Sequence, residues 1–298
     1  MLTLDYLAAL AETHRAALAA PVRSFTLKSQ VFNPWPLVSL MGVVNLSSDS
    51  WYRESVVLSV EAAVRRGLRL ATEGARLVDV GAESTLLQAS RVDPAAQTRQ
   101  LLPVIEQLTA AGVAVSVETY HPSVTAACLK AGAAVLNLTA GQDTTVFYRM
   151  AAEHEAGVIL CYVQDAANVR EVTDFHRLDD PVTLLYDYFA RETERAVQAG
   201  CKRLWIDPGL GFYYRNLSDS AARVRHQMET FLNSFRLRSL GWPVCHALPH
   251  AFEYFEDEVR SAEPFFAVLA LLGQTDLLRT HEVARVRGVL ETLKVMPS

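Results

Sequence analysis

Polar side chains suited to ligand recognition follow eight short apolar runs in this sequence. They are mostly amides, carboxylates and cationic groups rather than the serines and lysines common in surface loops. A carboxylate accepts two N–H bonds from an amino-pyrimidine edge, and an amide pairs with neighbouring donor and acceptor atoms. The set therefore suits a flat heterocycle. The candidate residues are Asn45, Thr85, Glu118, Asn137, Gln164, Asp207, Arg279 and His281.

The last of these positions offer a candidate site for an anion. Arg279 and His281 flank Thr280, and residues at i and i+2 of a strand point to the same face. Guanidinium and imidazole donors on one face can hold a phosphate-like group. Asp207 has a plainer alternative, because Asp207-Pro208-Gly209 also reads as a tight turn.

Eight strands are predicted, and all are apolar along most of their length. Such runs are typical of parallel strands that are buried on both faces. The carboxyl ends of the strands in an α/β barrel carry the ligand site, which would bring the polar residues together. The predicted strands span residues 37–44, 77–80, 114–117, 135–138, 158–162, 203–206, 244–247 and 277–279.

Helical segments separate these runs, and several end at a glycine just before the next strand. Gly74, Gly112, Gly132 and Gly200 occupy this position, where a left-handed residue stops a helix. The repeated unit predicts an α/β fold, specifically a (β/α)8 TIM barrel with an N-terminal helical extension. We expect residues 1–36 to form the extension, with a helix below or beside the barrel, and residues 37–298 to form the barrel.

Composition limits the classes of partner. The chain has 298 residues and a formal net charge of −5, which argues against a broad nucleic-acid surface. No run of apolar residues is long enough for a membrane span. Four cysteines without zinc spacing read as reduced, buried thiols, so a cytoplasmic location is expected.

Five motifs, in order along the chain, carry a family resemblance. Together they resemble the signatures of dihydropteroate synthases, which read roughly MGILNVTPDSF, GGESTRPG, SVDTxK, DPGIGFGK and RVHDV. The resemblance covers residues 37–295. The corresponding segments are MGVVNLSSDS at 41–50, GAEST at 81–85, SVETY at 116–120, DPGLGF at 207–212 and LRTHEV at 278–283.

The resemblance implies a pterin-binding TIM barrel that joins 6-hydroxymethyl-7,8-dihydropterin pyrophosphate to p-aminobenzoate in folate biosynthesis. It places Glu118, Asn137 and Asp207 in the pterin pocket, with Asp207 on the 2-amino and N3 edge. Thr85 and Gln164 are the further substrate-binding candidates. The catalytic candidates Asn45, Arg279 and His281 would face the pyrophosphate, and Asn45 would help to hold Mg²⁺.

The sequence also departs from the family pattern. Leu86-Leu87-Gln88 replaces Arg-Pro-Gly in the second loop, and the seventh strand lacks the family's lysine. His250 is a partial substitute for that lysine, although it and His246 are also compatible with packed or surface roles. Two alternatives therefore stay open: a diverged pterin-binding paralogue without synthase activity, and a pterin-dependent methyl transferase. A homodimer is expected, through residues 264–272 and 283–293.

Overall fold

The computed structural model describes residues 1–47, 49, 56–57, 59–84, 89–141, 143–164, 167–169, 171, 174, 180, 182–211 and 217–296. Eight parallel strands form its central sheet, in the order β8-β7-β6-β5-β4-β3-β10-β9. The strands are β3 (Ser39–Asn45), β4 (Leu77–Gly81), β5 (Val115–Thr119), β6 (Val135–Leu138), β7 (Gly157–Cys161), β8 (Leu204–Asp207), β9 (Cys245–Ala247) and β10 (Leu277–Thr280).

The sheet closes on itself through its two edge strands, β8 and β9. Ile206 forms a parallel bridge with Val244, and the Ile206 amide donates to the Pro243 carbonyl at 3.0 Å. The predicted (β/α)8 barrel is therefore confirmed, and each predicted strand is present to within two residues at either end.

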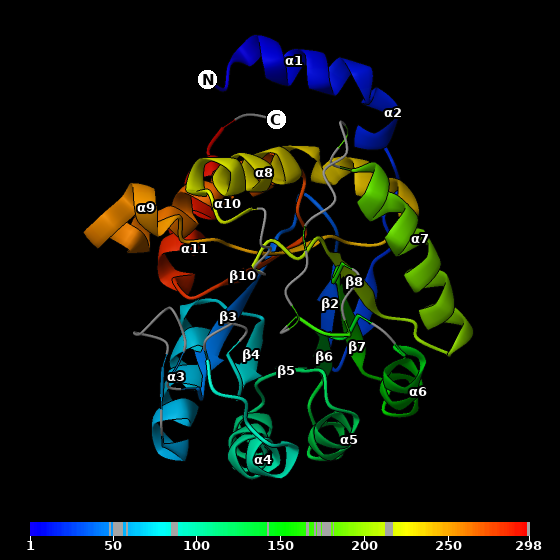
Figure 1. Cartoon of the computed structure of the whole chain (residues 1–298), viewed down its shortest axis with the longest axis vertical. Coiled ribbons are helices and arrows are strands. Elements are labelled where there is room, and N and C mark those ends of the chain that lie inside the picture. Colours follow the sequence, from blue (N-terminus) through cyan, green and yellow to red (C-terminus); the bar gives the residue numbers. More distant parts are fainter. Residues whose placement is uncertain are drawn as a thin grey trace.

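Helices surround the strands, as Figure 1 shows. The barrel helices are α3 (Val60–Glu73), α4 (Pro94–Ala110), α5 (Pro122–Lys130), α6 (Thr145–Glu153), α7 (Thr183–Gln198), α8 (Ser220–Asn233), α10 (Ala262–Leu272) and α11 (Val283–Leu293). Short helical segments lie between them, namely η3 (Ser234–Leu240), α9 (Phe252–Phe255) and η4 (Glu256–Ser261). Gly74 ends α3 with φ 116°, a left-handed conformation that favours glycine.

A β-hairpin, which the sequence did not predict, covers the amino-terminal end of the barrel. Its strands are β1 (Phe25–Leu27) and β2 (Gln30–Phe32), paired antiparallel. Phe25 and Phe32 pack edge-on against the buried ring of Trp205, with centroids 4.6 and 5.2 Å away. The expected helices are present earlier in the extension, but a hairpin and not a helix covers this end of the barrel.

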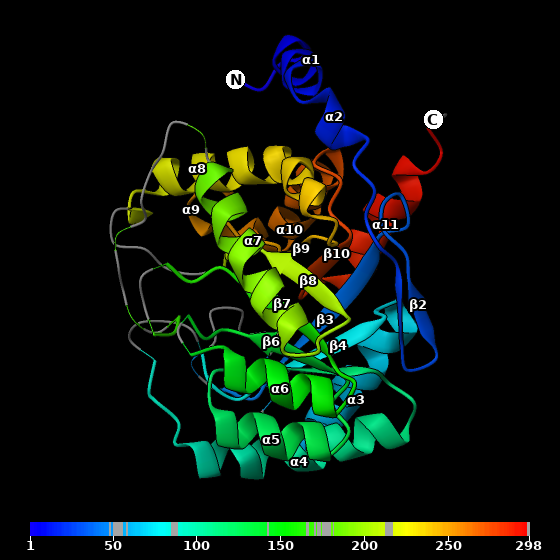
Figure 2. The ribbon, with the colours of Figure 1, turned by 90° about the vertical axis from the view of Figure 1, so that its right-hand side faces the viewer.

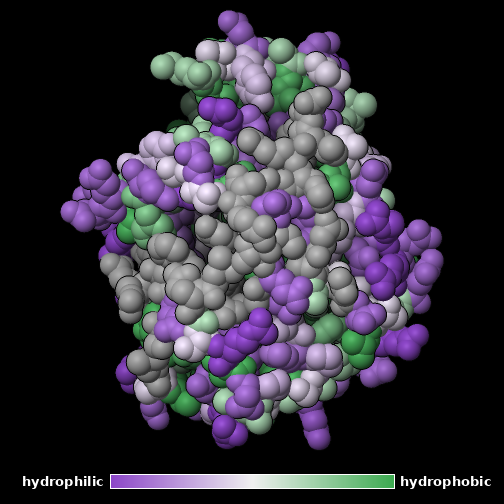
Figure 3. Space-filling view, viewed as in Figure 1, coloured by the Kyte–Doolittle hydropathy of each residue, from purple (hydrophilic) through white to green (hydrophobic). Residues whose placement is uncertain are grey.

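Two helices precede the hairpin, α1 (Leu4–Thr13) and α2 (Arg15–Leu18), and neither has a buried residue. Figure 2 shows them on the outside of the barrel helices, well away from the strands. Leu4 and Tyr6 are exposed, and hydrophobic atoms are visible around α1 at the top of Figure 3. None of the described helices is both long and apolar enough to cross a membrane.

Helices α8 and α10 approach so closely that only glycine fits at one position. A Cβ atom on Gly273 would lie 1.8 Å from the Phe231 carbonyl oxygen. We expect Gly273→Ala to lower the free energy of unfolding by about 1–3 kcal/mol, because backbone must move to relieve the overlap. Urea denaturation measures this change.

Gly288→Ala in α11 is the matched control. A Cβ atom there meets no described atom within 4 Å. The same substitution should therefore stabilise the protein by about 0.5–1 kcal/mol, since alanine favours a helix over glycine. Equal effects of the two substitutions would contradict the close approach of α8 and α10.

Candidate active site

The inside of the barrel changes from apolar to polar along the strands. Side chains alternate between the two faces of a strand, so every second residue points inward. Near the amino-terminal ends the buried inward cluster is apolar, and it includes Met41, Leu77, Ile159 and Trp205. Two residues further along, the same faces carry polar groups: Asp79, Asn137, Cys161, Asp207 and Arg279.

Arg279, on β10, is the cation at the centre of this polar group. Its Nε lies 2.7 Å from Asp79 Oδ2, and its Nη2 lies 2.6 Å from Glu118 Oε2. Burial would lower the pKa of Arg279, but the Glu118 and Asp79 carboxylates outweigh it and raise the pKa above its usual value. Arg279 therefore ties together strands β4, β5 and β10 while its side chain keeps 17% exposure.

Asp79 is a site residue that was not predicted from the sequence. Its carboxylate is fully buried, and besides Arg279 it accepts bonds from Ser116 Oγ at 2.6 Å and Asn137 Nδ2 at 3.1 Å. Asn137 Oδ1 in turn accepts from the Cys161 thiol at 3.2 Å. The available signal was an acidic residue inside the otherwise apolar run 77–80.

Asp207 ends β8 next to this network. It is buried, and its Oδ1 accepts the Gly209 amide at 2.8 Å, so the turn at Asp207-Pro208-Gly209 is also present. Among the residues that the structure describes, no lysine or arginine forms an ion pair with Asp207. Burial raises the pKa of Asp207 to about 6, against the opposing effects of the Gly209 amide and Arg279.

The charges in this network do not balance. Asp79 and Glu118 both pair with the guanidinium of Arg279, and Asp207 interacts electrostatically with all three of these groups. Burial raises the pKa of Glu118 to about 7, with Arg279 opposing and the other two carboxylates reinforcing the shift. Near neutral pH the cluster can hold a proton, and it favours a ligand that presents N–H donors.

The remaining predicted residues lie at other strand ends. Asn45 ends β3, where its backbone carbonyl accepts the Val57 amide at 2.9 Å. Gln164 follows β7 and is buried; it accepts from the Tyr162 hydroxyl at 3.2 Å and donates to the Asp174 carbonyl at 2.7 Å. Thr85 lies outside the described residues.

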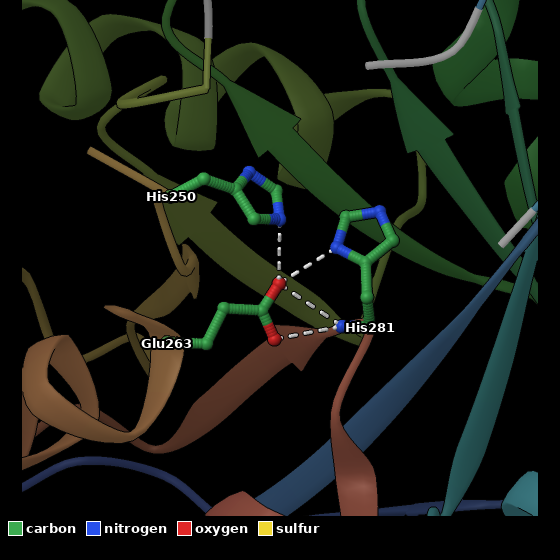
Figure 4. A group of neighbouring side chains, drawn as sticks. All are labelled: His250, Glu263 and His281. Carbon is green, nitrogen blue, oxygen red and sulfur yellow. Dashed lines mark hydrogen bonds and ion pairs between the residues drawn. The ribbon is translucent and has the colours of Figure 1, made fainter. Parts of the chain in front are cut away.

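His281 belongs to a different cluster from Arg279, although both lie at the carboxyl end of β10. Its Nδ1 is 2.7 Å from Glu263 Oε1, and His250 Nε2 is 3.0 Å from the same oxygen (Figure 4). His246 is fully buried and contacts Phe231 and Ser234, which agrees with a packed role. The sequence reading singled out His281 and His250 but not Glu263.

Comparisons with known proteins show what the chain is similar to. The sequence matches the family model described as "Pterin binding enzyme" over residues 41–247. It is 30% identical to the dihydropteroate synthase of Streptococcus pyogenes serotype M6 over 210 residues, which cover 69% of this chain and 73% of the relative.

Solved structures give the same picture over more of the chain. Dihydropteroate synthase from Xanthomonas albilineans with 4-aminobenzoic acid is 28% identical, has a TM-score of 0.74, and is matched over 92% of this chain and 99% of that chain. The same enzyme in complex with 7,8-dihydropteroate is 26% identical, with a TM-score of 0.72 and coverage of 92% and 100%.

Proposed function

This chain belongs to the dihydropteroate synthase family, and from that membership we propose that it condenses 6-hydroxymethyl-7,8-dihydropterin pyrophosphate with p-aminobenzoate. The relative from X. albilineans has been solved with 4-aminobenzoic acid and with 7,8-dihydropteroate, which supports these two ligand classes. The observation that carries the proposal is the buried Asp207 carboxylate at the carboxyl end of β8, which forms no ion pair among the described residues.

The polar layer complements a pterin edge. The 2-amino and N3 groups of the ring present adjacent N–H donors, which a single carboxylate can accept together. Asp207 supplies that acceptor, and Asn137 supplies an amide two strands away in the barrel wall. Glu118 lies on β5, the strand next to β6, and is the direct ladder partner of Asn137.

The reaction breaks the carbon–oxygen bond to pyrophosphate and forms a carbon–nitrogen bond to the arylamine, which then gives a proton to solvent. This chemistry depends mainly on stabilising the negative charge that develops on the leaving group. We assign that task to Arg279, His281 and Asn45. Thr85 and Gln164 complete the proposed substrate contacts.

A magnesium site near β3 is part of the proposal. The side-chain amide of Asn45 and the carboxylate of Asp49 offer oxygen ligands, which Mg²⁺ prefers, and substrate phosphates usually complete its octahedron. We propose that Asn45 holds Mg²⁺ together with the pyrophosphate. A bound Mg²⁺ would supply positive charge to the leaving group.

Pterin affinity should depend on pH. The proposed pterin contact needs ionised Asp207, and the pKa of this group is raised to about 6. Pterin affinity should therefore be highest well above that pH. It should fall about tenfold for each pH unit below it, because one proton competes with the ligand. Calorimetry with a bare pterin between pH 5 and 8 measures this. A flat profile in that range would remove Asp207 from the pocket.

The proposed reaction is tested by pyrophosphate release. Purified protein is supplied with the dihydropterin pyrophosphate, p-aminobenzoate and Mg²⁺, and release is followed with a coupled phosphate assay. Release that requires p-aminobenzoate and yields dihydropteroate by mass spectrometry supports the proposal. Pterin binding without release would instead fit the non-catalytic paralogue.

Assembly and location are part of the proposal. We propose a homodimer through α10 and α11, where Phe265 and Leu272 expose large apolar side chains. A cytoplasmic location is supported by the cysteines, because all four are free and buried.

A further inference from the structure

Three side chains from separate segments converge at the carboxyl end of β10. They are His250, in the segment after β9, Glu263, in the first turn of α10, and His281, directly after β10. One nitrogen of each ring and one oxygen of the carboxylate lie within 4.8 Å of one another. Figure 4 shows both rings directed at the same carboxylate oxygen.

The carboxylate is held so that its two oxygens have different surroundings. Glu263 Oε2 accepts the Thr280 hydroxyl and the backbone amides of His281 and Glu282, at 2.9 and 3.1 Å for the amides. Oε1 contacts both imidazoles and lies 3.2 Å from the His281 amide. Such anchoring of one oxygen orients the other toward a metal ion.

Glu263 is a buried carboxylate in apolar surroundings. Glu263 is fully buried in an otherwise apolar helix, and within the described part of the chain no lysine or arginine contacts it.

The charged groups around the cluster do not neutralise Glu263. Arg260 is paired with Glu282 at 2.8 Å, and Arg285 contacts the same Glu282 at 3.0 Å. Arg66 donates to backbone carbonyls, including that of His281 at 3.4 Å. Within the described residues, the side chains that reach Glu263 Oε1 are therefore the two imidazoles.

We propose that His250, Glu263 and His281 form a binding site for a divalent transition-metal ion of the zinc class. Two imidazole nitrogens and one carboxylate oxygen are a ligand set that zinc adopts when it keeps an open position. Nitrogen ligands disfavour Mg²⁺ and Ca²⁺, which take oxygen donors. The site is therefore distinct in kind from the proposed magnesium contact at Asn45.

The geometry needs little adjustment to accept the ion. Zinc ligands at about 2.0–2.1 Å in a tetrahedron lie about 3.4 Å from one another. The two nitrogen–oxygen distances are now 2.7 and 3.0 Å, within about 1 Å of that value, and all three ligand atoms lie within 4.8 Å of one another. The His250 and His281 side chains keep 14% and 12% exposure, which leaves a route for the ion.

The open position of the ion has an evident use at this end of the barrel. This use rests on the proposed function. A zinc-class ion bound by His281 would bind an oxygen of the pyrophosphate, and Arg279 lies two residues earlier in the sequence. His250 lies in the segment where the family pattern has its lysine. The ion would thereby return positive charge to a segment that lacks that side chain.

Metal binding can be measured without any assay of activity. Tag-free protein, stripped with a chelator, is titrated with Zn²⁺ in competition with a chromophoric chelator, and in parallel with Co²⁺ to record its ligand-field absorption. We expect one equivalent to bind and the Co²⁺ spectrum to indicate four- or five-fold coordination. No stoichiometric binding of either ion would overturn the proposal.

Variants locate the ion. His250→Ala, His281→Ala and Glu263→Gln should each weaken Zn²⁺ binding by more than about tenfold, since even outer partners of ligands matter that much. His154→Ala is the matched control, because His154 is exposed at the end of α6 and should leave binding unchanged. Equal binding by all four variants would assign the ion to another place.

Two further measurements keep the outcomes separate. Circular dichroism shows whether Glu263→Gln still folds, and if it does not, the two histidine variants and the Co²⁺ spectrum of the wild type decide. Zn²⁺ is then tested for its effect on the affinity for inorganic pyrophosphate, which should rise severalfold. Synthase activity without zinc binding would reject the metal site alone, and zinc binding without activity would reject only the proposed reaction.

Discussion

Asp207→Asn should weaken pterin binding by about 2–4 kcal/mol, which corresponds to a loss of about 30-fold to 1000-fold in affinity. The substitution keeps the shape of the side chain but replaces a charged acceptor with an amide. One of the two ring N–H donors would then face an NH₂ group or a weaker oxygen in a buried site. Calorimetry with a bare pterin at pH 8 measures the change.

The design of this measurement separates recognition from folding. Asp143→Asn is the matched control, since Asp143 is exposed with φ 51°, a conformation that asparagine tolerates. It should leave pterin affinity unchanged. Because ionised Asp207 is costly to bury, Asp207→Asn should not destabilise the free protein at pH 8. Unchanged pterin affinity in a folded Asp207→Asn protein would remove the proposed pocket.

Arg279→Met should lower the free energy of unfolding by about 3–5 kcal/mol, because it leaves buried carboxylates without their cation. Asp79 is fully buried and Glu118 nearly so, and both are bonded to the same guanidinium. Urea denaturation at pH 8 measures the loss. Arg149→Met on the exposed face of α6 is the control and should change stability little.

A second variant tests the cause of this loss. Arg279→Met placed in an Asp79→Asn background should cost clearly less than in the wild type, because one uncompensated charge has been removed. Additive losses in the double variant would show that Arg279 acts through packing rather than through its charge. For ligands, Arg279→Ala should weaken a pyrophosphate-bearing pterin more than a bare pterin, and equal losses would contradict its assigned role.

The barrel could be predicted from the sequence because each of its signals is local. Buried parallel strands need apolar runs, and glycine at positions such as Gly74 marks the ends of helices. The hairpin of residues 25–32 escaped prediction for the opposite reason. The hairpin is held in place by Phe25 and Phe32, which pack on Trp205, and this contact joins segments that are far apart in the chain.

The candidate site could be predicted only in part, for a similar reason. Residues at strand ends, such as Asp207 and Asn45, can be predicted from their position in the sequence. Asp79 and Glu263 are not, because each looks like an isolated acid within an apolar element. Only the closed barrel reveals that Asp79 meets Arg279, and only the turn after β10 reveals that Glu263 meets His281.

The hairpin has a consequence for how this chain can be divided. The family match ends at residue 247 and begins at residue 41, yet the barrel floor needs residues 25–32 and its wall needs β10. A fragment limited to the matched segment would lose the hairpin that packs on Trp205. It would also lose β10, the strand between β3 and β9. Such a fragment would expose apolar side chains to water and would leave β3 and β9 with unpaired edges. Both conditions promote aggregation.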